Sequence, residues 1–238
     1  MLTYVDSTKM GRGRHGWLES HFHFSFANYY NPENIRFGVL RVVNDDIVQP
    51  GEGFGTHPHS DMEIISYVIN GNLSHKDSMG SEQTITRGEL QYMSAGTGIT
   101  HSEYNNGSEE LRFAQIWIFT DQQGYQPQYG DFRFRWEERI DKWLHMVTGV
   151  EKPVGNAPVH IHQDANIYAS YLTAGKELSF EVGADRQAYL VLFEGSAEVN
   201  NIKLKERDAL EIVKENVTIK AKEDAHMLIL EMAYDDDK

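Results

Sequence analysis

The stretch FGTHPHSDMEIISYVING, residues 54–71, places two histidines one residue apart in front of an apolar, β-branched run that ends at a glycine. Short runs of Ile, Val and Tyr bounded by Gly, Asp or Ser are typical of β-strands. Side chains two residues apart in a strand point to the same face, so His57 and His59 would present both imidazoles together. The stretch therefore predicts a β protein with a pair of potential ligands near the start of a strand.

Segments of the same kind recur along the whole chain. They are 35–44, 63–71, 111–119, 187–195, 197–204, 209–213, 216–221 and 226–232. Many short strands at roughly even spacing predict an all-β sandwich or barrel. Helical periodicity is scarce, and residues 131–142 (DFRFRWEERIDK) are too polar and mixed to assign.

The two halves of the chain share an internal pattern. Residues 63–75 and then 84–96 form one series, and residues 187–199 and then 202–213 form the other. Each series has a strand, a glycine turn, a strand, a charged turn and a further strand. We infer two diverged copies of one β module, joined between residues 119 and 155, with accidental similarity between β segments as the alternative.

The composition limits the class of partner and of site. The chain of 238 residues has 22 basic and 36 acidic residues, a net charge of −14, and no cysteine. Such a charge repels phosphates, so neither nucleic acid nor an anionic membrane is expected as a partner. Without thiolates, any metal must be held by His and carboxylate side chains.

The N-terminal residues, MLTYVDSTKMGRGRHG, lack the apolar segment of a signal peptide, and no run approaches the ~18 apolar residues of a membrane span. A soluble, cytoplasmic protein is expected. The scarcity of long apolar surface runs favours a monomer. Residues 233–238 are interpreted as a polar tail of the kind that an expression vector adds, and are left out of the fold.

A second histidine pattern follows later in the chain. His101 and Glu103, in GTGITHSEYN, also lie two residues apart. A barrel that folds back could bring both pairs around one ion, because each pair shares a strand face. Three imidazoles and one carboxylate suit Fe, Mn, Co, Ni, Cu or Zn, and an octahedral ion would keep two positions open. The alternative is that a lone His-x-His lies in an exposed loop and binds no metal.

Glu63 competes with Glu103 for the role of carboxylate ligand. It lies six residues after His57, so in a continuous strand it would point to the same face. Both carboxylates with three histidines would leave little room for a substrate. Spacing alone does not decide between the two.

Five further histidines are interpreted as not binding the metal. They are His21, His23, His160, His162 and His226. The first two are expected to be strand or surface residues. When Gly195 is aligned with Gly71, the ligand positions of the second module fall at Glu181 and Gly183 rather than at a histidine. The second module is therefore predicted to have lost its metal.

The glycines around both histidine pairs resemble the two cupin motifs, and longer passages resemble the pirin family, in particular its bacterial quercetin-dioxygenase-like members. These passages are residues 15–32, 40–46, 53–71, 75–80 and 88–105, with VHIHQDANIY (159–168) in the second half. The resemblance implies a bicupin of two double-stranded β-helix barrels of the jelly-roll type. The expected domains are 1–135, with the metal site, and 136–232, with a degenerate site.

The resemblance also implies the site and its chemistry. One divalent metal would be held by His57, His59, His101 and Glu103, with Glu63 beside a ligand imidazole. Iron(II) is the expected metal, although copper, nickel, manganese, cobalt or zinc would fit the same ligands. The implied activity is that of a quercetin 2,3-dioxygenase, in which O2 is inserted into a flavonol and carbon monoxide leaves. Glu103 would take the proton of the flavonol hydroxyl.

Two other classes of function compete with the dioxygenase. The pirin family also implies a metal-binding regulatory or redox-sensing protein, which at this charge would act through a protein partner rather than on DNA. A storage-type cupin is disfavoured, because such a protein has no need of a complete ligand set.

Overall fold

The structure, a computed structural model, describes residues 1–149 and 157–235. Across those ranges the regular structure is β, apart from two short 3-10 helices, so the all-β prediction is confirmed. The chain forms two compact units. The N-terminal unit comprises Gly11–Phe134 with Ile161–Gln163, and the C-terminal unit comprises the described residues of Met1–Met10, Arg135–His160 and Asp164–Lys238.

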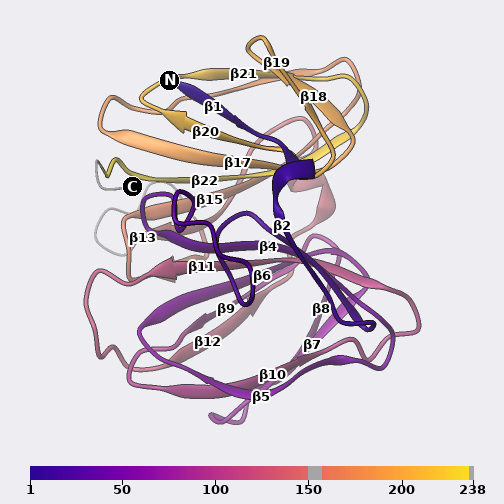
Figure 1. The fold of residues 1–238 in the computed structure, drawn as a ribbon, viewed down its shortest axis with the longest axis vertical. Coiled ribbons are helices and arrows are strands. Elements are labelled where there is room, and N and C mark those ends of the chain that lie inside the picture. Colours follow the sequence, from indigo (N-terminus) through magenta and orange to yellow (C-terminus); the bar gives the residue numbers. More distant parts are fainter. Residues whose placement is uncertain (150–156, 236–238) are drawn as a thin grey trace. The chain divides into compact units, whose positions relative to one another are not determined.

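The N-terminal unit is built from two antiparallel sheets (Figure 1). Its strands are β2 (Gly11–Arg14), β3 (Leu18–Phe22), β4 (Leu40–Val48), β5 (Gly53–His59), β6 (Met62–Asn70), β7 (Asn72–Asp77), β8 (Glu82–Thr86), β9 (Leu90–Ser94), β10 (Ile99–Tyr104), β11 (Leu111–Phe119) and β12 (Gln128–Phe132). The larger sheet has the order β12-β9-β6-β11-β4-β3-β2, and the smaller has the order β5-β10-β7-β8.

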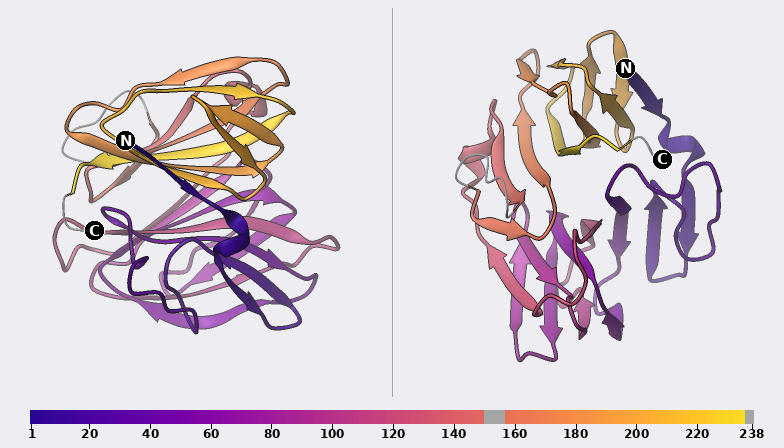
Figure 2. Two further views of the ribbon diagram at one scale, coloured as in Figure 1. Left: turned by 45° about the horizontal axis from the view of Figure 1, so that its top comes forward. Right: turned by 90° about the vertical axis from the view of Figure 1, so that its left-hand side faces the viewer.

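The C-terminal unit is built in the same way (Figure 2). Its elements are β1 (Leu2–Val5), η1 (Ser7–Lys9), η2 (Trp136–Arg139), β13 (Leu144–Gly149), β14 (Val159–Ile161), β15 (Ala165–Leu172), β16 (Glu177–Phe180), β17 (Arg186–Glu194), β18 (Ser196–Val199), β19 (Ile202–Lys205), β20 (Ala209–Val213), β21 (Val217–Ala221) and β22 (Ala225–Ala233). Its sheets have the orders β1-β20-β17-β22-β15-β13-β14 and β16-β21-β18-β19.

The strand orders confirm the internal repeat. β9-β6-β11-β4 in one unit matches β20-β17-β22-β15 in the other, and β5-β10-β7-β8 matches β16-β21-β18-β19. Each glycine turn that the sequence pattern aligned, Gly71 and Gly195, has a positive φ of 80° or 81°. A Cβ there would also collide with a neighbouring backbone carbonyl, so both turns require glycine. Part of the expected junction, residues 150–156, lies outside the described residues.

The apolar residues of the N-terminal unit fill the space between its two sheets. The cluster joins Val48, Val68, Leu73, Ile85, Leu111 and Phe113. Central strand β6 is buried from Glu63 to Ile69, because it lies between β9 and β11 and both of its faces are covered. Its polar side chains must therefore find partners inside the protein.

A sharp corner separates the first histidine pair from Glu63. β5 ends at His59 and β6 begins at Met62 in the other sheet, with Asp61 at φ 47° between them. The prediction that Glu63 shares a strand face with His57 is wrong, because the alternation of side chains does not continue through a corner.

The first ten residues pack in the C-terminal unit, although the expected domain 1–135 assigned them to the other module. β1 pairs with β20, and the Tyr4 hydroxyl donates to Asp208 at 2.7 Å. At the other end, Ala233 is the last residue of β22 and the Tyr234 N–H donates to Asp185 O. Residues 236–238 of the predicted tail lie outside the described residues.

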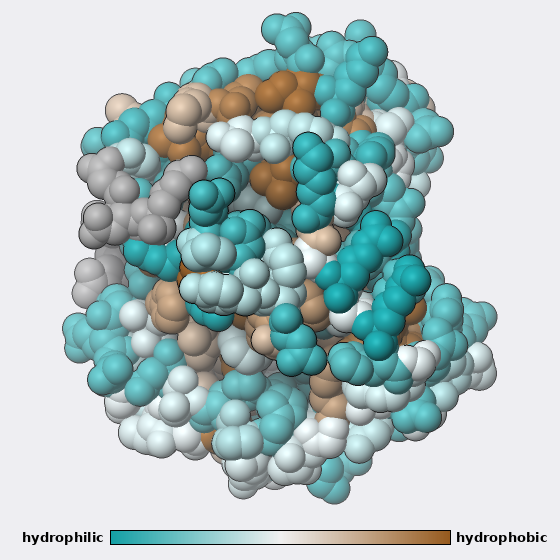
Figure 3. All heavy atoms as spheres, viewed as in Figure 1, coloured by the Kyte–Doolittle hydropathy of each residue, from teal (hydrophilic) through white to brown (hydrophobic). Residues whose placement is uncertain are grey.

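Hydrophilic side chains cover most of the face drawn in Figure 3, as expected from the net charge of −14. No helix among residues 1–149 and 157–235 has the length and apolar character needed to span a membrane.

Candidate metal centre

Three of the four predicted ligands converge in the N-terminal unit. β5 and β10 are antiparallel neighbours, and their register places His101 directly opposite His57. The potential ligand atoms of His57, His59 and His101 all lie within 4.8 Å of one another. His57 and His59, two residues apart on β5, therefore lie beside His101 of the neighbouring strand β10.

The ring nitrogens of this group are arranged as ligands. His57 Nδ1 donates to Gly55 O at 2.7 Å, which leaves its Nε2 as an acceptor. That Nε2 faces the Nε2 of His101 at 3.1 Å, and the Nε2 of His59 is buried without a hydrogen-bond partner. The accepting Nε2 of His57, the facing Nε2 of His101 and the unpartnered Nε2 of His59 fit a cation held between the three rings. Three imidazole nitrogens arranged in this way fit a divalent transition metal.

The low pKa values of two of these histidines also favour metal binding. Burial, with the neighbouring His101 and His57, lowers the pKa of His59 to about 4. Burial, with His57 and His75, lowers the pKa of His101 to about 3. Both rings are neutral at pH 7, as metal binding requires.

Glu103, the fourth predicted ligand, lies in a second group with His75 and His101. Its carboxylate is buried and accepts three hydrogen bonds. Oε1 accepts from Ser66 Oγ and Gln91 Nε2, both at 2.8 Å, and Oε2 accepts from Gln115 Nε2 at 2.7 Å. Since a carboxylate offers about four acceptor positions, one remains free on Oε2 for a metal or a proton.

The donors to Glu103 form one polar row across the larger sheet. The strand registers place Gln91 on β9 opposite Ser66 on β6, Ser66 opposite Gln115 on β11, and Gln115 opposite Asn44 on β4. Sequence reasoning missed this row, because its members lie on four strands far apart in the chain. Its effect is to hold the carboxylate in a fixed orientation.

His75 is a further site residue that sequence reasoning missed. Its Nε2 contacts Asp77 Oδ2 at 3.0 Å, its ring stacks on Tyr129, and its Nδ1 is buried without a hydrogen-bond partner. It lies opposite Glu103 in the β7–β10 register. The spacing His75-x-Asp77 is itself an i, i+2 pair and could have signalled it.

Glu63 contacts other residues than the predicted metal ligands. Its Oε1 accepts from Ser94 Oγ at 2.9 Å and contacts His162 Nδ1 at 3.0 Å, while its Oε2 is buried without a hydrogen-bond partner. Burial raises the pKa of Glu63. His162, set aside from the sequence, is thus the partner of a buried carboxyl, whereas His160 is exposed.

The other histidines set aside from the sequence lie outside both ligand groups. His21, on β3, and His23, just after it, are buried rather than at the surface. His226, on β22, is buried with its Nδ1 2.9 Å from Glu194 Oε2.

The equivalent positions of the C-terminal unit are apolar. Phe180 pairs with Val217 where His57 pairs with His101, and Ile219 pairs with Val199 where Glu103 pairs with His75. These side chains pack in the core and offer no ligand atom. The sequence alignment of Gly195 with Gly71 placed these positions at Glu181 and Gly183 instead. That placement is at least one residue too late, because β16 already ends at Phe180.

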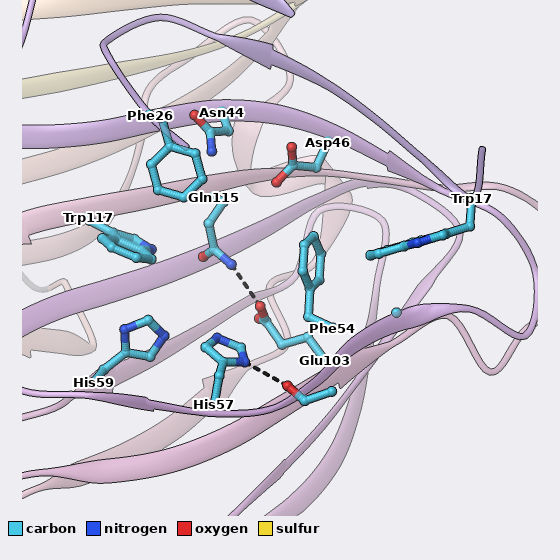
Figure 4. A pocket seen from close by; sticks show the side chains of 12 residues that line it. Trp17, Phe26, Asn44, Asp46, Phe54, His57, His59, Glu103, Gln115 and Trp117 are labelled. Carbon is cyan, nitrogen blue, oxygen red and sulfur yellow. Dashed lines mark hydrogen bonds between the residues drawn. The ribbon is translucent and has the colours of Figure 1, made fainter. Parts of the chain in front are cut away.

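A cavity of about 400 Å³ adjoins His57 and His59 (Figure 4). Its aromatic lining comprises Trp17, Phe26, Phe54 and Trp117, and its polar lining includes Asn44, Asp46, Glu103 and Gln115. Cavities of this size and apolar character are typical of small-molecule sites.

Comparison with known proteins agrees with this architecture. The Pirin family model matches residues 5–118, and the model of the quercetinase C-terminal cupin domain matches residues 152–232. The quercetin 2,3-dioxygenase of Escherichia coli K12 is 38% identical, with 98% of this chain and 99% of that protein covered. A pirin-like protein of Caulobacter vibrioides is 42% identical over 94% of this chain and 97% of its own.

Solved structures are also similar. The crystal structure of YhhW from Escherichia coli has a TM-score of 0.90 at 38% identity, covering 98% of this chain and 97% of that one. A second structure, of the bacterial pirin YhhW in complex with nickel(II), has a TM-score of 0.90 at 37% identity and covers 98% and 99%. The predicted bicupin fold is confirmed, and a related protein binds a divalent transition metal. This chain belongs to the pirin family.

Proposed function

We propose that this protein is a metal-dependent dioxygenase that cleaves a flavonol such as quercetin with O2 and releases carbon monoxide. The observation that supports it best is the convergence of three imidazoles, His57, His59 and His101, beside an aromatic-lined cavity of about 400 Å³. The names of the related proteins support the same activity.

The three imidazoles and Glu103 would hold the metal. When bound, a divalent transition metal supplies Lewis acidity that favours the deprotonated form of a phenolic or enolic hydroxyl. We assign iron(II) as the native metal, and nickel(II), found in the related structure, would occupy the same ligands.

Glu103 is proposed as both ligand and base. Its one remaining acceptor position, on Oε2, would bind the metal first and, once released from the metal, would take the proton of the flavonol 3-hydroxyl, while Ser66, Gln91 and Gln115 hold the carboxylate in place. The aromatic side chains would exclude water and orient the flat substrate by stacking on it.

The atoms balance without a further reductant. O2 adds across C2 and C4 of the flavonol, the C2–C3 and C3–C4 bonds break, and C3 leaves with its own oxygen as carbon monoxide. Both atoms of O2 remain in the depside product, so O2 is the oxidant and the flavonol is oxidised.

Oxygen uptake and carbon monoxide release with quercetin test the proposal. Protein reconstituted in turn with each first-row divalent metal is compared with His57→Ala and Glu103→Ala, and with His160→Ala as an exposed histidine control. Turnover should be lost in the first two variants and kept in the control. No turnover with any of these metals would exclude the dioxygenase and favour the regulatory alternative.

A further inference from the structure

Two polar side chains on β4 line the cavity with hydrogen-bonding capacity unused. Figure 4 shows Asn44 and Asp46 on the wall across from His57 and His59. Asn44 is 2% exposed and Asp46 is 3% exposed, and the Oδ1 atom of each has no hydrogen-bond partner. Because an unpaired buried polar atom is costly, two at one wall point to a ligand that supplies the missing partners.

The strand fixes both side chains toward the cavity. Residues 44 and 46 share a face of β4, whereas Asp45 between them points to the other face and pairs with Arg112 at 2.6 Å. Asp46 also accepts a hydrogen bond from Ser20, which lies opposite it on β3. Asn44 and Asp46 thus line the cavity, and the Oδ1 atom of each lacks a partner within the protein.

Resting on the proposed function, we propose that Asn44 and Asp46 recognise hydroxyl groups on the substrate ring remote from the metal, and so select polyhydroxylated aromatic substrates. Two acceptors two residues apart on a strand lie about 7 Å from each other. Hydroxyls on neighbouring ring carbons can reach both, since each hydrogen bond spans about 2.7 Å and the two bonds diverge.

The surroundings favour a neutral aromatic ligand at this wall. Phe26, Phe54 and Trp117 flank the two polar residues, so an aromatic ring would be covered on its apolar faces. Trp117 Nε1 is a third buried atom without a partner and can donate to a hydroxyl oxygen. Burial, with Asp45 and Glu103, raises the pKa of Asp46 to about 7, so its carboxyl can donate as well as accept near neutral pH.

Calorimetric titration of the nickel-loaded protein under nitrogen tests the proposal without turnover. The ligands are flavonols with two, one and no hydroxyls on the pendant ring: quercetin, kaempferol and galangin. We expect affinity to fall in that order, by roughly 5- to 50-fold overall. The Asn44→Leu and Asp46→Leu variants should each bind quercetin and galangin with more nearly equal affinity. Asp46→Asn, which keeps Oδ1, should keep the preference for quercetin. Asn70→Leu, at an exposed asparagine ending β6, should also keep it.

Equal affinity of the unaltered protein for the three flavonols, or no binding of any, would overturn the proposal, as would a preference that survives both leucine variants. The unaltered protein alone decides the first two outcomes, so a variant that fails to fold does not leave the question open. Oxygen uptake by the protein reconstituted in turn with each first-row divalent metal separates the two proposals. The expected ranking without turnover contradicts only the dioxygenase, and turnover without the ranking contradicts only the recognition site.

Discussion

His57 and His101 face each other across the β5–β10 pair with their Nε2 atoms 3.1 Å apart. Because Gly55 O fixes the proton of His57 on Nδ1, this nitrogen pair lacks a shared proton unless His101 supplies one. The low pKa of His101 makes a charged ring costly there. The pair is therefore suited to a cation, and removing either ring should have a specific effect on metal binding.

Replacement of His57 by alanine should lower metal affinity by at least about 100-fold. Loss of a residue that only orients a ligand costs 10- to 100-fold, so loss of an imidazole of the group should cost no less. Equilibrium dialysis followed by elemental analysis measures it, with His160→Ala as the exposed control. Full nickel occupancy of the His57 variant at equal free metal would contradict the assignment.

Metal binding should stabilise the protein. At a free nickel concentration 100 times the dissociation constant, the gain is about 2.7 kcal/mol, provided the unfolded chain does not bind. For a chain of this size that corresponds to an increase in Tm of about 5–10 °C. Differential scanning calorimetry with and without chelator measures the shift, and an equal shift in His101→Ala would place the stabilising ion elsewhere.

Replacement of Gln115 by leucine should weaken the hold on Glu103. The variant loses the donor to Oε2 while keeping a similar side-chain volume. We expect a decrease of about 10- to 100-fold in nickel affinity or in kcat/KM for quercetin. Gln128→Leu, at an exposed position on β12, is the matched control. If both variants behave alike, the polar row has no functional part.

His162 should stabilise the fold through Glu63 rather than through the metal. Removing the imidazole leaves the buried carboxyl of Glu63 with the hydrogen bond from Ser94 Oγ but without its contact to His162. His162→Ala should lower the free energy of unfolding by about 2–3 kcal/mol. Urea denaturation measures this, with His160→Ala as a control whose free energy of unfolding should change little. Unaltered nickel affinity in both variants would show that His162 acts on stability and not on metal binding.

Much of the fold was readable from the sequence because glycine turns and strand alternation are local. The pair His57 and His59 followed from spacing within one strand, and His101 from spacing within another. The contacts of Glu63 were not predictable, because the corner at Asp61 interrupts the alternation of β5 and the partner His162 lies about 100 residues away.

The polar row and the wall of β4 were hidden for a related reason. Gln115 and Asn44 become neighbours only through the β4–β11 register, which pattern alone does not specify. In the sequence, their amides cannot be distinguished from those of solvent-exposed residues. Burial, which distinguishes them, is a property of the assembled sheets.

Asp46 should make stability depend on pH in a defined direction. Burial, with Asp45 and Glu103, raises its pKa from 3.8 to about 7 in spite of the hydrogen bond from Ser20. The folded state then binds a proton that the unfolded state has released, so the contribution of Asp46 is most favourable below pH 3.8 and is lost as pH rises to about 7.

The variant Asp46→Asn has no carboxyl proton to release. Relative to the unaltered protein, its free energy of unfolding should increase by on the order of 4 kcal/mol between pH 4 and pH 8. Urea denaturation in chelator across this range measures the difference, in which the other titrating groups cancel. A difference that stays constant with pH would show that Asp46 is ionised throughout, with an ordinary pKa.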